Sequence, residues 1–174
     1  MIKIGDNIIS SLGFTTDENF RAVESGISGV KHYEAGNFDL PEAFMASLID
    51  KEKLNELFSS SFENNTDLTE LEKAVILSVY SANKEAKIDL SSPKTIFVIS
   101  TTKGNVDLLS DEKNIAQPIN PQVFLWHSAK AIAAFFRNPN TPVVVSNACI
   151  SGASAQIAAM RSLQSGKYDY AVVV

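Results

Sequence analysis

Residues Thr141 to Val174, TPVVVSNACISGASAQIAAMRSLQSGKYDYAVVV, contain the pattern that decides the fold. Val143 to Val145 form a short β-branched run, which is typical of a strand buried on both faces. The Ala-rich residues Ser151 to Ser165 predict a helix that stops at Gly166. Tyr170 to Val174 begins a second buried strand. The order of strand, sharp turn, helix and strand predicts an α/β fold with a mostly parallel sheet.

Cys149, the only cysteine of the chain, lies where the first strand hands over to the helix. The first amides of a helix have no partners inside it, and the helix dipole places partial positive charge at that end. A thiolate there is stabilised, so more of the nucleophilic form is expected at neutral pH. The same amides can hold the negative oxygen of a tetrahedral acyl intermediate. Cys149 is therefore the candidate catalytic nucleophile, and the competing interpretation is a small buried hydrophobic residue.

The segment NACISGASAQIAAMRSLQSGKYDYAVVV resembles the nucleophile segment of β-ketoacyl synthases, the thiolase-fold condensing enzymes of fatty acid and polyketide synthesis. In that family an Ala-Cys pair closes a strand, and small residues, an Ala-rich helix and a Gly-x-x-Asp turn follow. The matching residues are Ala148-Cys149, Ser151-Gly152, Gly166 and Asp169. The N-terminal segment IGDNIISSLGFTTDENFRAVESGISGV is similar to the family's opening strand, its turn (here Ser11 to Gly13) and its first helix. The resemblance thus covers both ends of the chain.

The resemblance implies a thiolase-like half, with helices on both faces of the sheet, that is truncated before its last strand. It assigns residues 1–174 to the N-terminal domain of a β-ketoacyl synthase whose C-terminal half is absent. Such enzymes are pseudo-duplicates, and the second half supplies two histidines, or a histidine and an asparagine, that drive malonyl decarboxylation. His32 and His127 match neither position. The chain alone is therefore expected to lack the full catalytic set.

The parent reaction that the resemblance implies is a decarboxylative condensation. Cys149 takes an acyl group from a thioester on acyl carrier protein, malonyl-carrier protein decarboxylates, and the resulting carbanion attacks the acyl-cysteine. The implied partners are an acyl carrier protein, a second copy of the chain in a homodimer, and a C-terminal half or partner subunit. The reaction needs no cofactor and no metal.

Three interpretations remain open at this point. The first is the N-terminal part of a β-ketoacyl synthase, as an expressed fragment, a proteolytic remnant or one subunit of a split enzyme. The second is a non-catalytic half-fold that serves in dimerisation or as a partner subunit. Such partner subunits of the family usually lack the cysteine, so Cys149 favours the first. The third is a self-contained Cys–His hydrolase, which the lack of a suitable histidine disfavours.

Composition limits the class of protein. With 174 residues and 45% hydrophobic content, the chain fits one domain with an apolar core. A net charge of −5 without a basic stripe argues against binding to nucleic acid. One cysteine, no signal peptide in Met1 to Gly13 and no run of membrane-span length predict a cytoplasmic protein. Asn64-Asn65-Thr66 matches a glycosylation sequon, which has no meaning without secretion.

Elsewhere, local patterns predict further elements. Strands are expected at Ile2 to Ile9 and Thr95 to Thr101. The first expected helix is Asp17 to Ser25, with Thr16 as N-cap and with Phe20 and Val23 pointing inward. A second helix begins at Pro41 and runs through Leu48, and a further turn is expected near Leu54 to Phe58. The last two helices run from a capping box at Asp67 and Glu70 to Ala86, and from Gln122 to Phe136.

Two shorter segments carry expectations of their own. Lys103-Gly104 follows the strand at Thr95 to Thr101, and a plain turn is preferred there to a phosphate loop because no Gly-rich run precedes it. The resemblance implies that Pro142 to Ser146 lies at a sheet edge and pairs antiparallel with its copy in a second subunit. The valine run agrees, since no charge or proline inside it would block an exposed edge.

Overall fold

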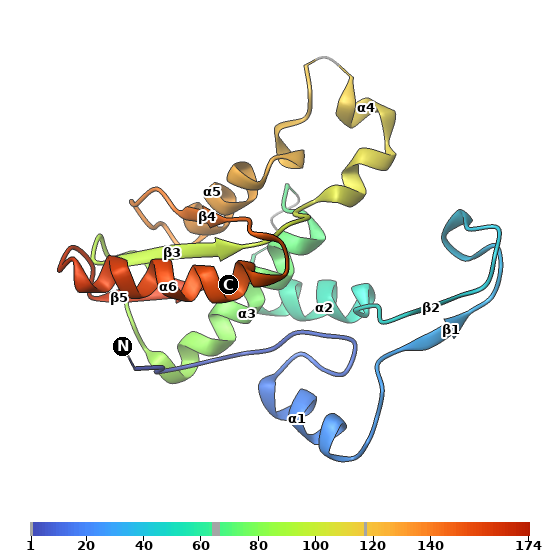
Figure 1. The fold of residues 1–174 in the computed structure, drawn as a ribbon, viewed down its shortest axis with the longest axis horizontal. Coiled ribbons are helices and arrows are strands. Elements are labelled where there is room, and N and C mark those ends of the chain that lie inside the picture. The colour runs from blue at the N-terminus through green and yellow to red at the C-terminus, as the bar shows by residue number, and fades with distance from the viewer. Residues whose placement is uncertain (1, 64–66, 117) are drawn as a thin grey trace.

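The computed structural model describes residues 2–63, 67–116 and 118–174, so the sequon at 64–66 lies outside the described residues. A parallel three-stranded sheet with the order β4-β3-β5 forms the centre of the fold (Figure 1). Its strands are β3 (Thr95–Ser100), β4 (Val143–Val145) and β5 (Tyr170–Val173). The prediction of an α/β fold with a parallel sheet is therefore confirmed.

The helices of the described residues are α1 (Thr16–Glu24), α2 (Lys51–Ser61), α3 (Glu70–Ala86), α4 (Glu112–Ile115), α5 (Leu125–Phe135) and α6 (Ser151–Gln164). Short 3-10 helices are η1 (Asn37–Asp39), η2 (Val106–Ser110), η3 (Pro121–Val123) and η4 (Ala148–Ile150). A separate antiparallel pair, β1 (Lys31–Tyr33) and β2 (Phe44–Ala46), lies away from the central sheet (Figure 1). No described helix combines the length and the apolar character that a membrane crossing requires.

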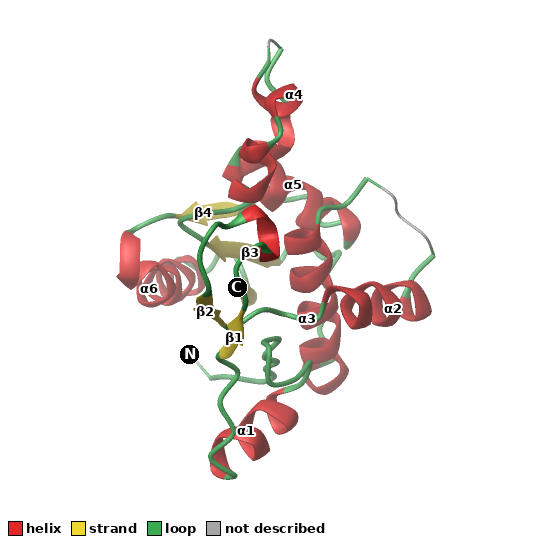
Figure 2. Ribbon diagram, turned by 90° about the vertical axis from the view of Figure 1, so that its right-hand side faces the viewer, coloured by secondary structure: helices red, strands yellow, loops and turns green. Residues whose placement is uncertain are grey.

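Helices cover both faces of the central sheet, as predicted, and Figure 2 shows α6 on one side with α3 and α5 on the other. Phe97 and Ile99 of β3 pack in the cluster formed with α3 and α5. Ile96 and Val98 pack instead against Ala155 and other residues of α6. Because β3 is buried on both faces, its signature in the sequence is an unbroken apolar run rather than an alternation.

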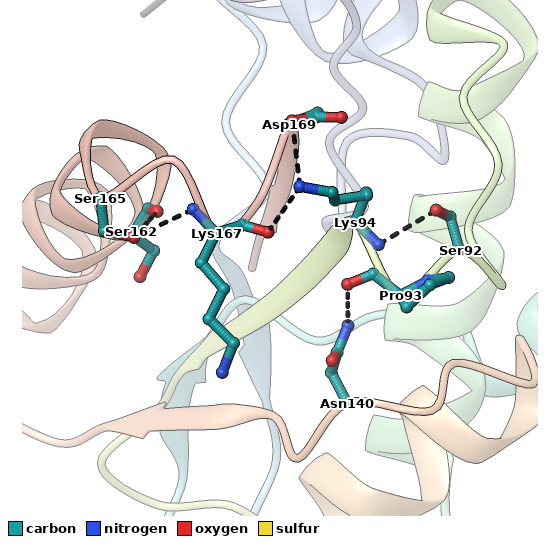
Figure 3. Close-up of polar contacts among 8 residues, drawn as sticks. All are labelled: Ser92, Pro93, Lys94, Asn140, Ser162, Ser165, Lys167 and Asp169. Carbon is teal, nitrogen blue, oxygen red and sulfur yellow. Dashed lines mark hydrogen bonds and ion pairs between the residues drawn. The ribbon is translucent and has the colours of Figure 1, made fainter.

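The amino-terminal end of the sheet is closed by polar contacts between three loops (Figure 3). Lys94 Nζ donates to the carbonyl of Lys167 at 3.3 Å and lies 3.9 Å from Asp169 Oδ1. Asn140 Nδ2 donates to the carbonyl of Pro93 at 2.9 Å. These residues precede the three strands, so the contacts fix the strand starts relative to one another. The carboxyl ends of the strands lie at the opposite end of the sheet, which is where binding sites of parallel sheets are found.

The predicted helix to Ala86 is confirmed, but its capping box differs from the prediction. Thr69, not Asp67, is the N-cap, because its side chain accepts from Glu72 N at 3.3 Å while the Glu72 carboxylate accepts from Thr69 N at 2.9 Å. The pattern of a small polar residue followed three positions later by Glu occurs twice in this segment. The helix begins at the second occurrence of this pattern, which is nearer to the apolar residues of the helix.

Helix α1 begins one residue before the prediction and faces the other way. Thr15 is its N-cap, and Phe20 and Val23, predicted to point inward, are each 65% exposed. The buried residue of the helix is Asn19, whose Nδ2 donates to the carbonyl groups of Ile8, Gly13 and Thr15. The amide of Asn19 satisfies loop carbonyls that would otherwise be buried without partners, and this requirement sets the inward face.

The strand predicted at residues 2–9 is wrong. In the described chain this segment pairs with no strand, and Ile2 is 85% exposed. Side chains hold it instead, since Asn7 Nδ2 donates to Phe14 O and to Ser78 Oγ, both at 3.2 Å. Apolar alternation predicts a strand only where a neighbouring strand is available to pair with it.

The helix predicted from Pro41 is also wrong, because residues 44–46 form β2. The expected irregular segment before it contains the partner strand, with Tyr33 opposite Phe44. Their rings stack with 5.3 Å between the centroids, and Phe38 packs edge-on against both. Cross-strand aromatic pairs of this kind stabilise a hairpin, and they outweigh the helical spacing of the apolar residues.

Glu18 gives a prediction on pH and stability. Its carboxylate accepts from Phe14 N at 2.6 Å and from Thr15 N at 3.1 Å, and the Phe14 hydrogen bond is the main cause that lowers the pKa of Glu18 below its ordinary value of 4.5. A carboxyl group with a lowered folded-state pKa adds stability above its unfolded pKa and loses it as the pH falls through the folded value. We expect Glu18→Gln to lower the free energy of unfolding by about 0.5–1 kcal/mol at pH 7.

Urea denaturation at pH 7 and at pH 3 measures this difference. The gap between the wild type and Glu18→Gln should shrink at the lower pH, where the wild-type carboxyl group becomes protonated. Glu24→Gln, an exposed change in the last turn of the same helix, serves as the matched control. A gap of the same size at both pH values would show that the charge of Glu18 adds nothing to the hydrogen bonds.

Candidate active site at Cys149

The candidate nucleophile lies at the end of the central sheet where the strands reach their carboxyl ends. Cys149 is the middle residue of η4, the single turn that joins β4 to α6. Its side chain is exposed, which does not fit the interpretation of Cys149 as a buried packing residue. The prediction that this residue lies between the end of a strand and the start of a helix is confirmed.

The turn is held in place by Ser151. Its hydroxyl accepts from Asn147 N at 2.8 Å and donates to Ala148 O at 2.7 Å, and Ser151 itself is only 7% exposed. Ala148 has a φ of +45°, in the left-handed region that costs a non-glycine residue of order 1 kcal/mol. The Ser151 hydrogen bonds offset this cost. The result is a tight reversal of the chain that presents Cys149 outward.

A backbone amide next to the thiol is available as a donor. Helix α6 begins without a side-chain cap, because its N-cap residue is Ile150, whose side chain has no hydrogen-bond acceptor. Within the described residues, no acceptor is found for the N–H of Cys149. This unpaired donor and the positive end of the α6 dipole therefore lie next to the thiol along the chain. Such an arrangement can stabilise a thiolate and can hold an oxyanion.

Cys149 lines an open depression of about 510 Å³ together with Thr102, Lys103, Ser146 and Ala148. Two of these residues follow β3 and three follow β4, and the two strands are parallel neighbours. The carboxyl ends of these two strands consequently lie side by side at the same end of the sheet. Sequence reasoning missed Thr102, Lys103 and Ser146 as site residues. The signal that was available is that each comes shortly after a predicted buried strand.

Neither histidine lines this depression. His32 belongs to β1 and His127 to α5, where its Nδ1 is buried without a hydrogen-bond partner in the described structure. Within residues 2–63, 67–116 and 118–174, no group of three or more His, Cys, Asp or Glu side chains is placed to hold a metal ion. The site as described therefore consists of a thiol, backbone amides, two hydroxyl groups and one lysine.

Comparison with known proteins identifies the fold. No protein-family model matches the sequence, and no curated protein matches it. Among solved structures, a β-ketoacyl synthase from Burkholderia phymatum STM815 matches with a TM-score of 0.70 and 16% identity, over 96% of this chain and 44% of that chain. The ishigamide ketosynthase/chain length factor matches with a TM-score of 0.68 and 19% identity, over 97% of this chain and 50% of that chain.

These matches confirm that the chain has a thiolase-like fold of the β-ketoacyl synthase type. The chain spans about half the length of the two solved chains. At 16% and 19% identity the likeness establishes the fold, and the chemistry of this chain has to be argued from its own residues.

Proposed function

We propose that residues 1–174 are the nucleophile-bearing N-terminal domain of a cytoplasmic β-ketoacyl-acyl carrier protein synthase in fatty acid or polyketide synthesis. The observation that carries the proposal is the exposed Cys149 at the β4–α6 turn, at the start of a helix that has no side-chain cap. The fold likeness supports it, since the solved chains that match are β-ketoacyl synthase and ketosynthase/chain length factor proteins.

The acyl-transfer step uses only groups of this site. The Cys149 thiolate attacks the carbonyl carbon of a thioester, and the carbonyl oxygen becomes an oxyanion to which the Cys149 N–H can donate a hydrogen bond. When the tetrahedral intermediate collapses, the bond from the acyl carbon to the carrier sulfur breaks. The carrier leaves as a thiolate and takes up a proton, which balances the proton that Cys149 has lost.

The proposed partners are an acyl carrier protein, a second copy of the chain, and a C-terminal half or partner subunit that brings the decarboxylation residues. Apolar side chains on the surface support a further covering partner. On α1, Phe20 and Val23 are 65% exposed, and Trp126 at the start of α5 is 51% exposed. Phe20 and Val23 lie three residues apart and share one face of α1, and exposed apolar side chains grouped in this way are typical of a protein contact.

The reactivity of Cys149 tests the proposal. At pH 7 we expect iodoacetamide to alkylate Cys149 about threefold to tenfold faster than free cysteine, because the helix terminus favours the thiolate. We also expect a butyryl thioester of N-acetylcysteamine to transfer its acyl group to Cys149, seen by intact-protein mass spectrometry. Cys149→Ala should take up neither label.

Circular dichroism in the same buffer controls for unfolding, which would expose the thiol without activating it. Ser151→Ala is the informative second variant, because it removes the hydroxyl that holds the turn and leaves the thiol in place. Alkylation at or below the rate of free cysteine, with no acyl transfer, would refute the nucleophile. That result would favour the alternative function, a non-catalytic half-fold for dimerisation.

A further inference from the structure

The segment that carries Lys103 to the depression around Cys149 is anchored at its far end by Asn105. This residue is 1% exposed, and both ends of its amide are used. Its Oδ1 accepts from Thr69 Oγ1 at 2.9 Å, and its Nδ2 donates to Gln122 O and to Ser128 Oγ, each at 2.9 Å. The buried amide therefore ties the segment to both α3 and α5.

The near end of the segment is fixed as well. Thr101 N donates to Val145 O at 3.2 Å, and Thr101 Oγ1 accepts from Gly104 N at 2.9 Å and from Lys103 N at 3.3 Å. Gly104 has a φ of +57°, and a Cβ at this position would overlap the Leu125 side chain. The backbone of Lys103 is therefore held at the wall of the depression by hydrogen bonds on both sides, and its side chain extends from that position.

The charge at this wall is not neutralised. In the described parts of the chain, the Lys103 ammonium makes neither a hydrogen bond nor an ion pair, whereas Lys3 and Lys94 pair with Asp6 and Asp169. The other residues that line the depression have no acidic group, being threonine, serine, alanine and the cysteine. The start of α6 adds partial positive charge on the same side. The depression is thus electropositive and has room for an anionic group.

We propose that Lys103 determines substrate specificity by binding a carboxylate, so that Cys149 takes acyl groups that end in a carboxylate in preference to neutral acyl groups of the same length. This inference rests on the proposed role of Cys149 as the acyl acceptor. The ammonium of lysine is a compact charge on a flexible stem, which suits an acyl chain whose carboxylate reaches the wall while its carbonyl lies at the thiol. The carboxylate replaces water at the ammonium and neutralises its charge.

A pair of alkylating reagents tests the charge preference without any thioester. Iodoacetate and iodoacetamide have nearly the same size and attack the same thiolate, and they differ in that iodoacetate carries a negative charge. The ratio of their rates therefore cancels the thiolate fraction of Cys149. We expect the ratio in the wild type to exceed that of free cysteine by about threefold to tenfold, the size of one charge contact in a solvent-accessible site. Salt at 1 M should remove most of the excess.

The variants locate the effect. Lys103→Gln should reduce the ratio to the value of free cysteine, and Lys103→Arg should keep most of it because the charge is retained. Lys113→Gln is the matched control, since Lys113 is an exposed lysine of α4 that does not line the depression. An unchanged ratio in Lys103→Gln, or an equal loss in Lys113→Gln, would overturn the inference, because the preference would then come from elsewhere on the chain.

Acyl transfer supplies the second measurement, with succinyl and butyryl thioesters of N-acetylcysteamine, which share a four-carbon acyl chain and contain no phosphate. In each case the Cys149 sulfur bonds to the acyl carbon and N-acetylcysteamine leaves as the thiol. The succinyl group should transfer about threefold to tenfold faster than the butyryl group, and Lys103→Gln should abolish the difference. Equal transfer of both groups would refute the specificity and leave the nucleophile intact. Transfer of neither group, with slow alkylation by iodoacetamide, would refute the nucleophile itself.

Discussion

The 174-residue polypeptide alone is expected to form no β-ketoacyl product from malonyl-carrier protein, even after Cys149 has been loaded with an acyl group. The depression around Cys149 offers no histidine, and the two histidines of the chain lie in β1 and α5. General acid–base groups contribute about 10²–10⁴-fold each, so the loss of two such groups lowers the rate of decarboxylation by at least about 10⁴-fold.

Release of labelled carbon dioxide from malonyl-carrier protein measures this rate. The assay is run on the polypeptide by itself and after addition of the C-terminal half of a β-ketoacyl synthase, with Cys149→Ala as the blank. Activity that appears only in the mixture would support a domain that depends on a partner for decarboxylation. Product from the 174-residue polypeptide alone would contradict the prediction and would require a catalytic role for His127 or His32.

The second large effect is expected at the free edge of β4. The predicted edge position is confirmed, because β4 pairs with β3 on one side and is the outer strand of the sheet in the described structure. Sequence alone suggests Val144→Lys as the disruptive change, but Val144 packs against the core cluster of Phe97 and α5, and lysine there would damage the fold. Val143 is 37% exposed and is the better position.

We expect Val143→Lys to raise the dimer dissociation constant at least about tenfold, since the two-fold axis brings like charges together.

Sedimentation at micromolar concentration compares the wild type with Val143→Lys. Tyr170→Lys is the matched control, because Tyr170 is 43% exposed on β5, the opposite edge of the same sheet. If the wild type sediments as a monomer, or if Tyr170→Lys dissociates the dimer and Val143→Lys does not, then β4 is not the edge that pairs.

The β4–α6–β5 unit could be predicted because its signals are local. The run of Val143 to Val145 is β-branched, and Gly166 ends the helix with a φ of +74°, a conformation that costs glycine little. The position of Cys149 between β4 and α6 could be predicted for the same reason, since the residues directly before and after it define that turn. Elements specified within about ten residues of chain are the ones that a sequence pattern predicts well.

The features that the sequence did not show depend on the hydrogen bonds of loop carbonyls and on the order of the strands, which no hydrophobic pattern indicates. The burial of Asn19, and with it the outward orientation of Phe20 and Val23, follows from loop carbonyls that surround the amide only in the folded chain. Thr102 and Lys103 join the candidate site because β3 is the neighbour of β4, and strand order is not encoded in any local pattern. When a site is formed by residues that follow two different strands, the sequence predicts only one of the two groups until the strand order is known.

The order of strands in the sheet also has a consequence for biosynthesis. β3 is the central and most buried strand, yet its partners β4 and β5 come much later in the chain and are therefore synthesised long after it. Until β4 and β5 have been made, the backbone N–H and C=O groups of β3 have no strand partners, and its apolar side chains are only partly covered. Parallel pairing between distant segments folds slowly and exposes chains to aggregation. Refolding of this chain from urea should therefore be slow, and its yield should fall as the protein concentration rises.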